Sequence, residues 1–181
     1  GLVGSLVSRD LRYMLVVEFG GANVQLLFAT IDYTVLPNWL SVRVGRFKLP
    51  FSRTFITMAS QLSLIDRPLT VGPSVFGDTV DVGIALHNGT NGPFEYSVGL
   101  FSGAGSRDPA SHIDPLLSVR VGYNHGDLEG YSESDLDGGP LRLGVAAAVL
   151  VDFDTDGDHT SYTSGTVDFI LKARGLSLSS A

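Results

Sequence analysis

The chain contains no cysteine among its 181 residues, which excludes a disulfide framework and a thiolate metal site. Basic residues are scarce: Lys and Arg together number 12 against 19 Asp and Glu, a formal charge of -7. This balance argues against nucleic-acid binding, which requires a basic face. Long apolar runs are absent too, since the longest, Val145–Val151, is far shorter than the ~18 residues of a transmembrane helix.

Patterns typical of catalysis are also missing. The Ser-rich stretches contain no nucleophile elbow, and no Gly-rich phosphate loop precedes a helix. Asp152–Asp158 begins like a calcium loop, but Thr163 stands where that loop needs a bidentate Glu. We therefore interpret it as a solvated acidic loop and expect no enzyme activity, no cofactor and no metal. The four histidines show no metal-ligand spacing: His87, expected to face a lumen, and His112, His125 and His159.

No signal peptide is visible at Gly1, and the chain begins without Met in what already reads as a strand. We therefore expect a processed or partial chain.

Alternation of apolar and polar or small residues is what the sequence does have, and this period of two predicts β-strands. About eight strands are expected, plus a partial one at Gly1–Ser8. Most span ~9–12 residues, longer than usual in globular sheets and close to the length of a tilted membrane strand. The expected strands are Leu11–Phe19, Val24–Tyr33, Trp39–Lys48, Val80–His87, Phe94–Phe101, Leu117–Asn124, Leu141–Phe153 and Val167–Arg174, the last continuing through Leu178.

The two faces of these strands differ in a way that favours a membrane barrel. One face carries Leu, Val, Ile, Phe and Tyr, and the mean hydropathy of +0.22 is high for a water-soluble domain. The other carries Gly, Ala and Ser with isolated charges, as on the inner wall of a water-filled barrel. Bilayer hydrocarbon leaves backbone polar groups unsatisfied, so a β-sheet within it must close. We predict an all-β, antiparallel transmembrane β-barrel. A soluble β-barrel that binds a small molecule is the alternative.

Several segments resemble the phosphate-selective porin family of Gram-negative outer membranes. The most specific is VGRFKLPFSR, in which a strand ends in Gly, a basic residue, an aromatic and Lys, followed by Pro-Phe. The similar segments are Val44–Arg53, Ser63–Pro68, Asp81–Gly89, Tyr96–Gly103 and Ser118–Gly126.

The resemblance implies an outer-membrane porin in contact with the lipid bilayer and lipopolysaccharide. It implies a homotrimer of barrels with about sixteen strands, of which residues 1–181 would form part. It further implies that the long loop, residues 49–77, folds toward the pore and narrows it. Cations in such a constriction would favour anions, and Arg suits phosphate because its planar fork donates two hydrogen bonds. The loop residues concerned are Arg53 and Arg67 and, subject to their orientation, Arg46, Lys48 and Asp66.

Alternation also predicts which charged side chains of the strands face inward. Inward cations are balanced by Glu18, Asp81, Glu95, Asp152 and Asp168. This balance favours a general pore for passive diffusion of small hydrophilic solutes, with weak ion preference. Passage of anions, phosphate among them, is what the porin resemblance implies. A small closed barrel with an anchoring role and no channel is a further alternative. The expected wall cations are Arg12, Arg43, Arg120, Arg142, Lys172 and Arg174.

For two cations near the loop, the sequence allows two orientations. Strict alternation turns Arg46 and Lys48 to the lipid side with Val44. Either a bulge at Gly45 re-aims them, or they sit above the membrane. Asp66 and Arg67 have a second interpretation as an ion pair that holds the loop.

Overall fold

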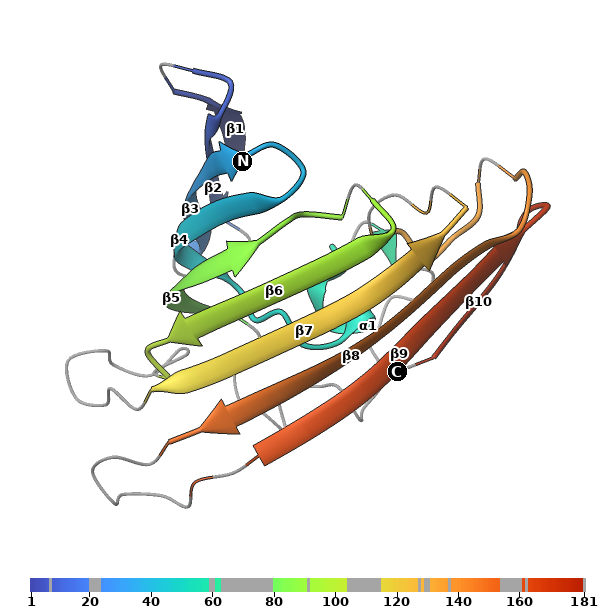
Figure 1. Cartoon of the computed structure of the whole chain (residues 1–181). Coiled ribbons are helices and arrows are strands. Elements are labelled where there is room, and N and C mark those ends of the chain that lie inside the picture. Colours follow the sequence, from blue (N-terminus) through green and yellow to red (C-terminus); the bar gives the residue numbers. More distant parts are fainter. Residues whose placement is uncertain are drawn as a thin grey trace.

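The computed structural model is an all-β chain whose strands form one antiparallel sheet (Figure 1). It describes residues 1–6, 8–19, 24–58, 61–62, 80–90, 92–103, 115–126, 128, 131–136, 138–153, 161 and 163–180. The single described α-helix is α1 (Arg53–Ile56). The strands are β1 (Leu2–Ser5), β2 (Leu11–Glu18), β3 (Gln25–Leu36), β4 (Leu40–Lys48), β5 (Val80–His87), β6 (Phe94–Phe101), β7 (Leu116–His125), β8 (Arg142–Asp152), β9 (Thr163–Ala173) and β10 (Leu176–Ser180).

Each strand pairs with the next one in sequence, from β1 to β10, without a crossover. Such a meander arises when alternating strands are joined at turns that reverse the chain. Figure 1 shows the resulting sheet curving from β1 across to β10, with α1 on one side of it. β1 and β10 do not pair with each other in the part of the chain that the structure describes, so the sheet is open there. None of the described helices has the length and apolar character needed to cross a membrane.

The strands expected from alternation are confirmed, but the end predicted for the last strand is wrong. A single strand was expected to continue through Leu178, whereas a two-residue turn, Arg174 and Gly175, separates β9 from β10. Both turn residues have positive φ, 52° and 86°, which is the type I′ geometry that suits a tight hairpin. Arg174 is therefore exposed in a turn instead of lying on a strand wall.

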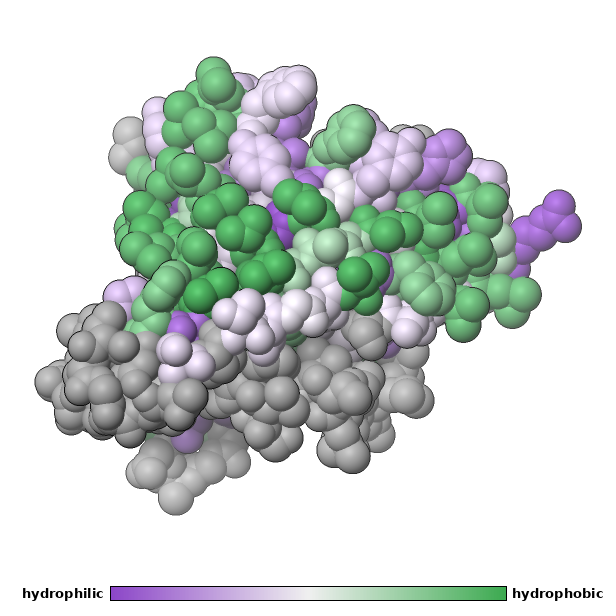
Figure 2. Space-filling view, turned by 60° about the horizontal axis from the view of Figure 1, so that its bottom comes forward, coloured by the Kyte–Doolittle hydropathy of each residue, from purple (hydrophilic) through white to green (hydrophobic). Residues whose placement is uncertain are grey.

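One face of the sheet, here called the outer face, exposes apolar side chains. Ile31, Val44, Ile84 and Leu100 are register partners across four neighbouring strands, and each is about half exposed (51, 49, 47 and 51%). Figure 2 shows apolar side chains gathered into a broad patch. A water-soluble protein seldom leaves so wide an apolar surface uncovered.

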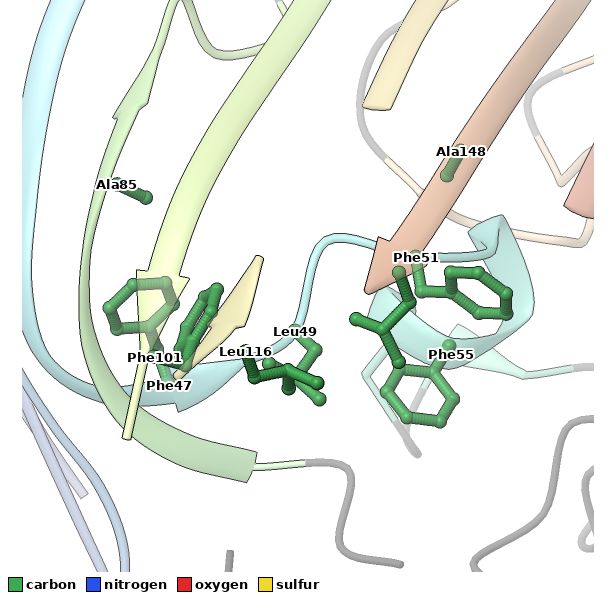
Figure 3. Close-up of a cluster of buried hydrophobic side chains, with 9 residues drawn as sticks. Phe47, Leu49, Phe51, Phe55, Ala85, Phe101, Leu116 and Ala148 are labelled. Carbon is green, nitrogen blue, oxygen red and sulfur yellow. The ribbon is translucent and has the colours of Figure 1, made fainter. Parts of the chain in front are cut away.

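The opposite, inner face holds the buried core. Phe47 of β4 packs on Phe101 of β6 with ring centroids 5.1 Å apart. Phe51 and Phe55, from the segment after β4, pack edge to face on each other. Figure 3 shows the Phe47 and Phe101 rings side by side and the Phe51 and Phe55 rings near each other, with Leu49 and Leu116 between the two pairs. The buried cluster is Phe47, Leu49, Phe51, Phe55, Ala85, Phe101, Leu116, Ala148 and Leu150.

The register between β4 and its neighbours is continuous through Gly45, so the bulge considered from sequence is absent. Gly45 has φ +127°, and a Cβ there would lie 2.0 Å from the Ala29 carbonyl oxygen. The position thus requires glycine because the backbone of β3 approaches closely. Arg46 remains on the same side of the strand as Val44, while Lys48, the last residue of β4, donates through Nζ to the Thr57 carbonyl at 2.6 Å.

Candidate pore-lining site

Arg120, on β7, is the centre of a buried polar network on the inner face. Its guanidinium binds the Asp168 carboxylate through two nitrogens, Nη1 to Oδ2 at 2.6 Å and Nη2 to Oδ1 at 3.1 Å. Its Nε donates to Glu95 Oε1 at 3.1 Å. Arg120 and Asp168 are 1% and 0% exposed. A two-point charge-assisted contact of this kind is among the stronger polar interactions in proteins.

The sheet register explains why these three side chains can meet. Asp168, Ala146, Gly122 and Glu95 occupy one row across β9, β8, β7 and β6. The two carboxylates thus stand at the ends of the row, with two small residues between them. Because Gly and Ala leave the space above the strands free, Arg120 can reach across the row to both carboxylates.

The segment that follows β4 is fastened to this network by its own arginine. The Arg53 backbone N–H donates to Asp168 Oδ2 at 2.9 Å, and Arg53 Nε lies 3.5 Å from Asp168 Oδ1. Arg53 Nη2 donates to Asn124 Oδ1 at 3.4 Å, and the Arg53 guanidinium stacks 5.2 Å from the Tyr131 ring centroid. Asn124 in turn donates to Glu95 Oε2 at 3.1 Å. Among the described residues, two arginines and two carboxylates therefore form one network in which the formal charges cancel.

Backbone carbonyls of the same segment are satisfied by the sheet. Ser118 Oγ donates to the Pro50 carbonyl at 2.8 Å, and Arg120 Nη1 donates to the Phe51 carbonyl at 2.7 Å. A loop buried against a sheet needs such partners, since unpaired carbonyls would be costly. These bonds fix the path of residues 49–53 across β7.

The short helix α1 is shaped by its caps. Ser52 Oγ accepts from the Phe55 N–H at 3.2 Å, an N-cap bond that initiates the turn. At the other end the Thr57 hydroxyl lies 2.7 Å from both the Arg53 and the Tyr131 carbonyl oxygens. Ser52 and Thr57 are both 0% exposed. The second Thr57 contact joins this segment to the chain that follows β7.

Gly144, on β8, provides the space for this arrangement. A Cβ at this position would lie 2.6 Å from Leu128 Cδ2, 2.8 Å from Asn124 Oδ1 and 2.9 Å from Arg53 Nη2. Contacts under 3 Å are repulsive, so a side chain here would displace the Arg53 guanidinium.

Burial raises the pKa of the Tyr131 hydroxyl to about 12, and the negative charge of Glu95 adds to the shift. The charges of Arg120 and Arg53 oppose it, but they are smaller in effect than burial. Tyr131 is therefore a neutral phenol in ordinary buffers.

A second cluster lies on the inner face of the first strands, around Asp32 of β3. Arg43 donates to Asp32 Oδ2 through Nη2 at 2.6 Å and Nε at 2.9 Å, and Arg12 Nη2 lies 3.5 Å from Oδ1. His87 Nε2 lies 3.1 Å from Asp32 Oδ2. The Gly89 N–H donates to His87 Nδ1, which leaves Nε2 to carry the ring proton and donate to Asp32. The Arg12 and Arg43 side chains are 55% and 38% exposed.

A third cluster joins the chain after β7 to the ends of β8, β9 and β10. Arg142 Nη2 donates to Asp135 Oδ1, and the Gly175 N–H donates to Asp135 Oδ2 at 2.9 Å. Lys172 Nζ donates to the Ser134 carbonyl at 2.9 Å. These contacts hold residues 131–136 over the strand ends.

The structure thus places most cations singled out in the sequence beside a carboxylate or a carbonyl oxygen. Asp66 and Arg67 lie outside the described residues, as do all of residues 63–79, which include the rest of the long loop expected at residues 49–77. Arg174 is in the β9–β10 turn. The cations in inner-face contacts are Arg43, Arg53, Arg120, Arg142 and Lys172.

Other members of the clusters were not candidates on sequence grounds. Glu95 and Asp168 were counted only as charges that offset the cations, and Asp32, Tyr131 and Asp135 were not singled out. Asp32 shares the inner face with Thr30, two residues earlier on β3, so alternation alone could have found it. Tyr131 and Asp135 lie in a connection between strands, where no periodicity indicates contacts.

Comparisons of this chain with protein-family models, with curated proteins and with solved structures found no match. The resemblance to phosphate-selective porins consequently depends on the sequence segments alone.

Proposed function

We propose that this chain forms part of the wall of an outer-membrane porin through which small hydrophilic solutes and anions diffuse passively. The observation that carries the proposal is the arrangement of the two faces. Half-exposed apolar side chains run across the outer face at Ile31, Val44 and Ile84, while buried ion pairs occupy the inner face. This is the reverse of a soluble sheet, and it suits a wall between lipid and an aqueous interior.

Strand length supports the same proposal. β8 has 11 residues, which span about 36 Å at ~3.3 Å per residue. At a tilt of about 40° such a strand crosses about 28 Å, comparable with the ~25 Å apolar band of outer-membrane barrels. Bilayer hydrocarbon would not satisfy the open edges β1 and β10. We therefore infer that further strands close the barrel, with about sixteen strands and three barrels per assembly as the porin resemblance implies.

Exposed aromatic side chains support a membrane interface at one end of the sheet. Trp39 in the β3–β4 turn is 73% exposed, and Phe94 at the start of β6 is 68% exposed. Phe94 packs on Tyr123 with ring centroids 5.4 Å apart, and Tyr96 donates to the Trp39 carbonyl. Amphipathic and aromatic rings favour the headgroup level of a bilayer.

Connection length favours one orientation. The aromatic end carries the short connections 37–39 and 174–175 together with the longer connection 126–141, whereas the other end carries the longest connection, 49–79, and connection 102–115. Porins place short turns toward the periplasm and long loops outside the cell. We therefore infer that the end with residues 49–79 faces outward.

A depth-dependent substitution tests the membrane assignment. Ile84 lies in the middle of β5 and Leu36 at the end of β3, and both are about half exposed on the surface (47% and 55%). In a bilayer, Ile84→Arg should cost about 2–4 kcal/mol of folding free energy and Leu36→Arg about 0–1 kcal/mol. Urea unfolding of the intact protein in lipid vesicles measures both. Equal, small costs, with a protein that stays folded and monodisperse without detergent, would favour the soluble alternative.

Channel activity needs its own measurement. Each described inner-face cation considered above has an anionic or carbonyl partner, which supports weak ion preference over a phosphate-specific site. Planar-bilayer recordings of the intact protein in a salt gradient should give steady conductance with a small reversal potential. A tight anion current blocked by phosphate would contradict weak selectivity, and a complete absence of conductance would favour an anchoring barrel.

A further inference from the structure

Two segments from opposite ends of the sheet meet on its inner face. One follows β4 and comprises residues 49–58 and 61–62; the other follows β7 and comprises residues 128 and 131–136. We call them together the plug. β4 and β7 point in opposite directions, since successive strands of the meander alternate. The plug therefore enters the interior from both ends.

The two segments are joined by direct contacts. The Thr57 hydroxyl lies 2.7 Å from the Tyr131 carbonyl oxygen, the Glu133 N–H donates to the Gln61 carbonyl at 3.1 Å, and the Arg53 guanidinium stacks on the Tyr131 ring. Each segment is also fastened to the sheet independently, the first through Asp168 and the second through Asp135. The plug is thus one connected body with two anchors.

The plug covers only one part of the inner face. Under it, on β7 to β9, Ser118, Ala146 and Asp168 are 0%, 2% and 0% exposed. On β2 and β4, the side chains of Arg12 and Arg43 are 55% and 38% exposed. Water thus reaches the Arg12 and Arg43 side chains, although Asp32 between them is only 6% exposed, and it is excluded from the three covered positions on β7 to β9.

Opening the covered part would be costly. Arg120 and Arg53 share Asp168, and separating them would leave buried charges without partners. The formal charges of the described network residues also cancel, so these residues give a passing ion no net attraction. These two properties indicate that the plug is fixed in place and does not act as a movable gate.

We infer that the interior is divided: the part along β6 to β9 is permanently filled by the plug, and the solute path follows β2 to β4. The second half of this inference deepens the proposed porin function and rests on it. Arg12 and Arg43 would then face the passing solute, and the buried Asp32 carboxylate would hold both arginines in place.

Cysteine labelling tests the division without requiring conductance, and the chain has no cysteine of its own. Arg12→Cys reports the open part, and Ser118→Cys and Ala146→Cys report the covered part. In the folded intact protein, a water-soluble maleimide should modify the first variant about 100-fold faster than the other two, because local opening must precede reaction there. Intact-mass spectrometry measures the rates. Labelling of both covered positions at the rate of Arg12→Cys would overturn the division.

A cross-link tests whether the plug is fixed. Gln61→Cys and Glu133→Cys in one molecule should be joined by a short bis-maleimide, and single-channel conductance should stay within about 20% of the reduced, unlinked protein if the plug does not move. Attaching a bulky maleimide at Arg12→Cys should lower conductance severalfold. Failure to cross-link, or loss of conductance on cross-linking, would refute a fixed plug. Absence of conductance in the parent protein would refute the porin proposal, while the labelling rates still decide the division.

Discussion

The inner face contains two Arg–Asp clusters that differ mainly in their access to water. In the Arg120–Asp168 cluster both partners are nearly inaccessible, at 1% and 0% exposure. In the Arg43–Asp32 cluster the aspartate is buried but 38% of the arginine side chain is exposed. The same chemistry therefore fastens a plug in one place and leaves a hydrated polar wall in the other. The cover, and not the residue types, distinguishes the two regions.

Removing one carboxylate from each cluster should separate them most clearly. Asp168→Asn leaves Arg120 and Arg53 buried with insufficient counter-charge, which should cost about 3–5 kcal/mol of unfolding free energy. Asp32→Asn leaves arginines that water can reach, so about 1 kcal/mol is expected. Urea unfolding followed by the fluorescence of Trp39, the chain's one tryptophan, measures both. Equal losses would mean that the plug does not desolvate Asp168.

Adding a methyl group should also destabilise the protein more on the covered inner surface than on the outer face. Gly144→Ala forces carbon against Arg53 Nη2 and Leu128 within 2.9 Å, at an expected cost of about 1–3 kcal/mol. Gly165, on β9, is the matched control because its Cβ would approach only the Ala148 carbonyl, at 3.8 Å. Gly165→Ala should change the unfolding free energy by less than about 0.5 kcal/mol. A neutral Gly144→Ala would show that the plug can shift aside.

The contact between the two plug segments at Thr57 should contribute less to the unfolding free energy than the contacts that fasten the plug to the sheet. Thr57→Val keeps the shape of the side chain but removes the hydroxyl between the Arg53 and Tyr131 carbonyl oxygens, at an expected cost of about 1 kcal/mol. Thr57→Ser retains the hydroxyl and serves as the control. Proteolysis of the folded protein should detect a loosened segment as faster cleavage within residues 49–62. Identical cleavage of both variants would mean that contacts other than the Thr57 hydroxyl hold the two plug segments together.

Much of the sheet could be predicted from sequence because alternation reports which face a strand residue occupies. It located the strands from Leu11 to Ala173, and it placed Arg43, Arg120, Arg142 and Lys172 on the inner face. It failed at Arg174, because a tight turn that lasts two residues preserves the alternating pattern across itself. Local periodicity does not distinguish a strand that continues from one that folds back.

The site was harder to predict because its partners are far apart in sequence. Gly and Ala on the inner face were interpreted as the wall of a water-filled lumen. In the described part of β6 to β8 they instead make room for the protein's own atoms, as Gly144 does for Arg53. A small residue indicates a close neighbour, and it does not say whether that neighbour is water or protein. The contact between Thr57 and Tyr131 has a sequence separation of 74, for which no local signal exists.

The smallest effect expected is one that is silent at neutral pH. The pKa of Tyr131 is about 12 in the folded protein, against about 10 for an unfolded tyrosine. The unfolded state therefore loses this proton first, so Tyr131's contribution to stability is complete below pH 10 and is lost as the pH rises to 12. Subtracting the tyrosinate absorbance of Tyr131→Phe from that of the parent gives the titration of this one group among six tyrosines. A midpoint near 10 in the folded protein would mean that water reaches Tyr131, and the covered region would then resemble the open one.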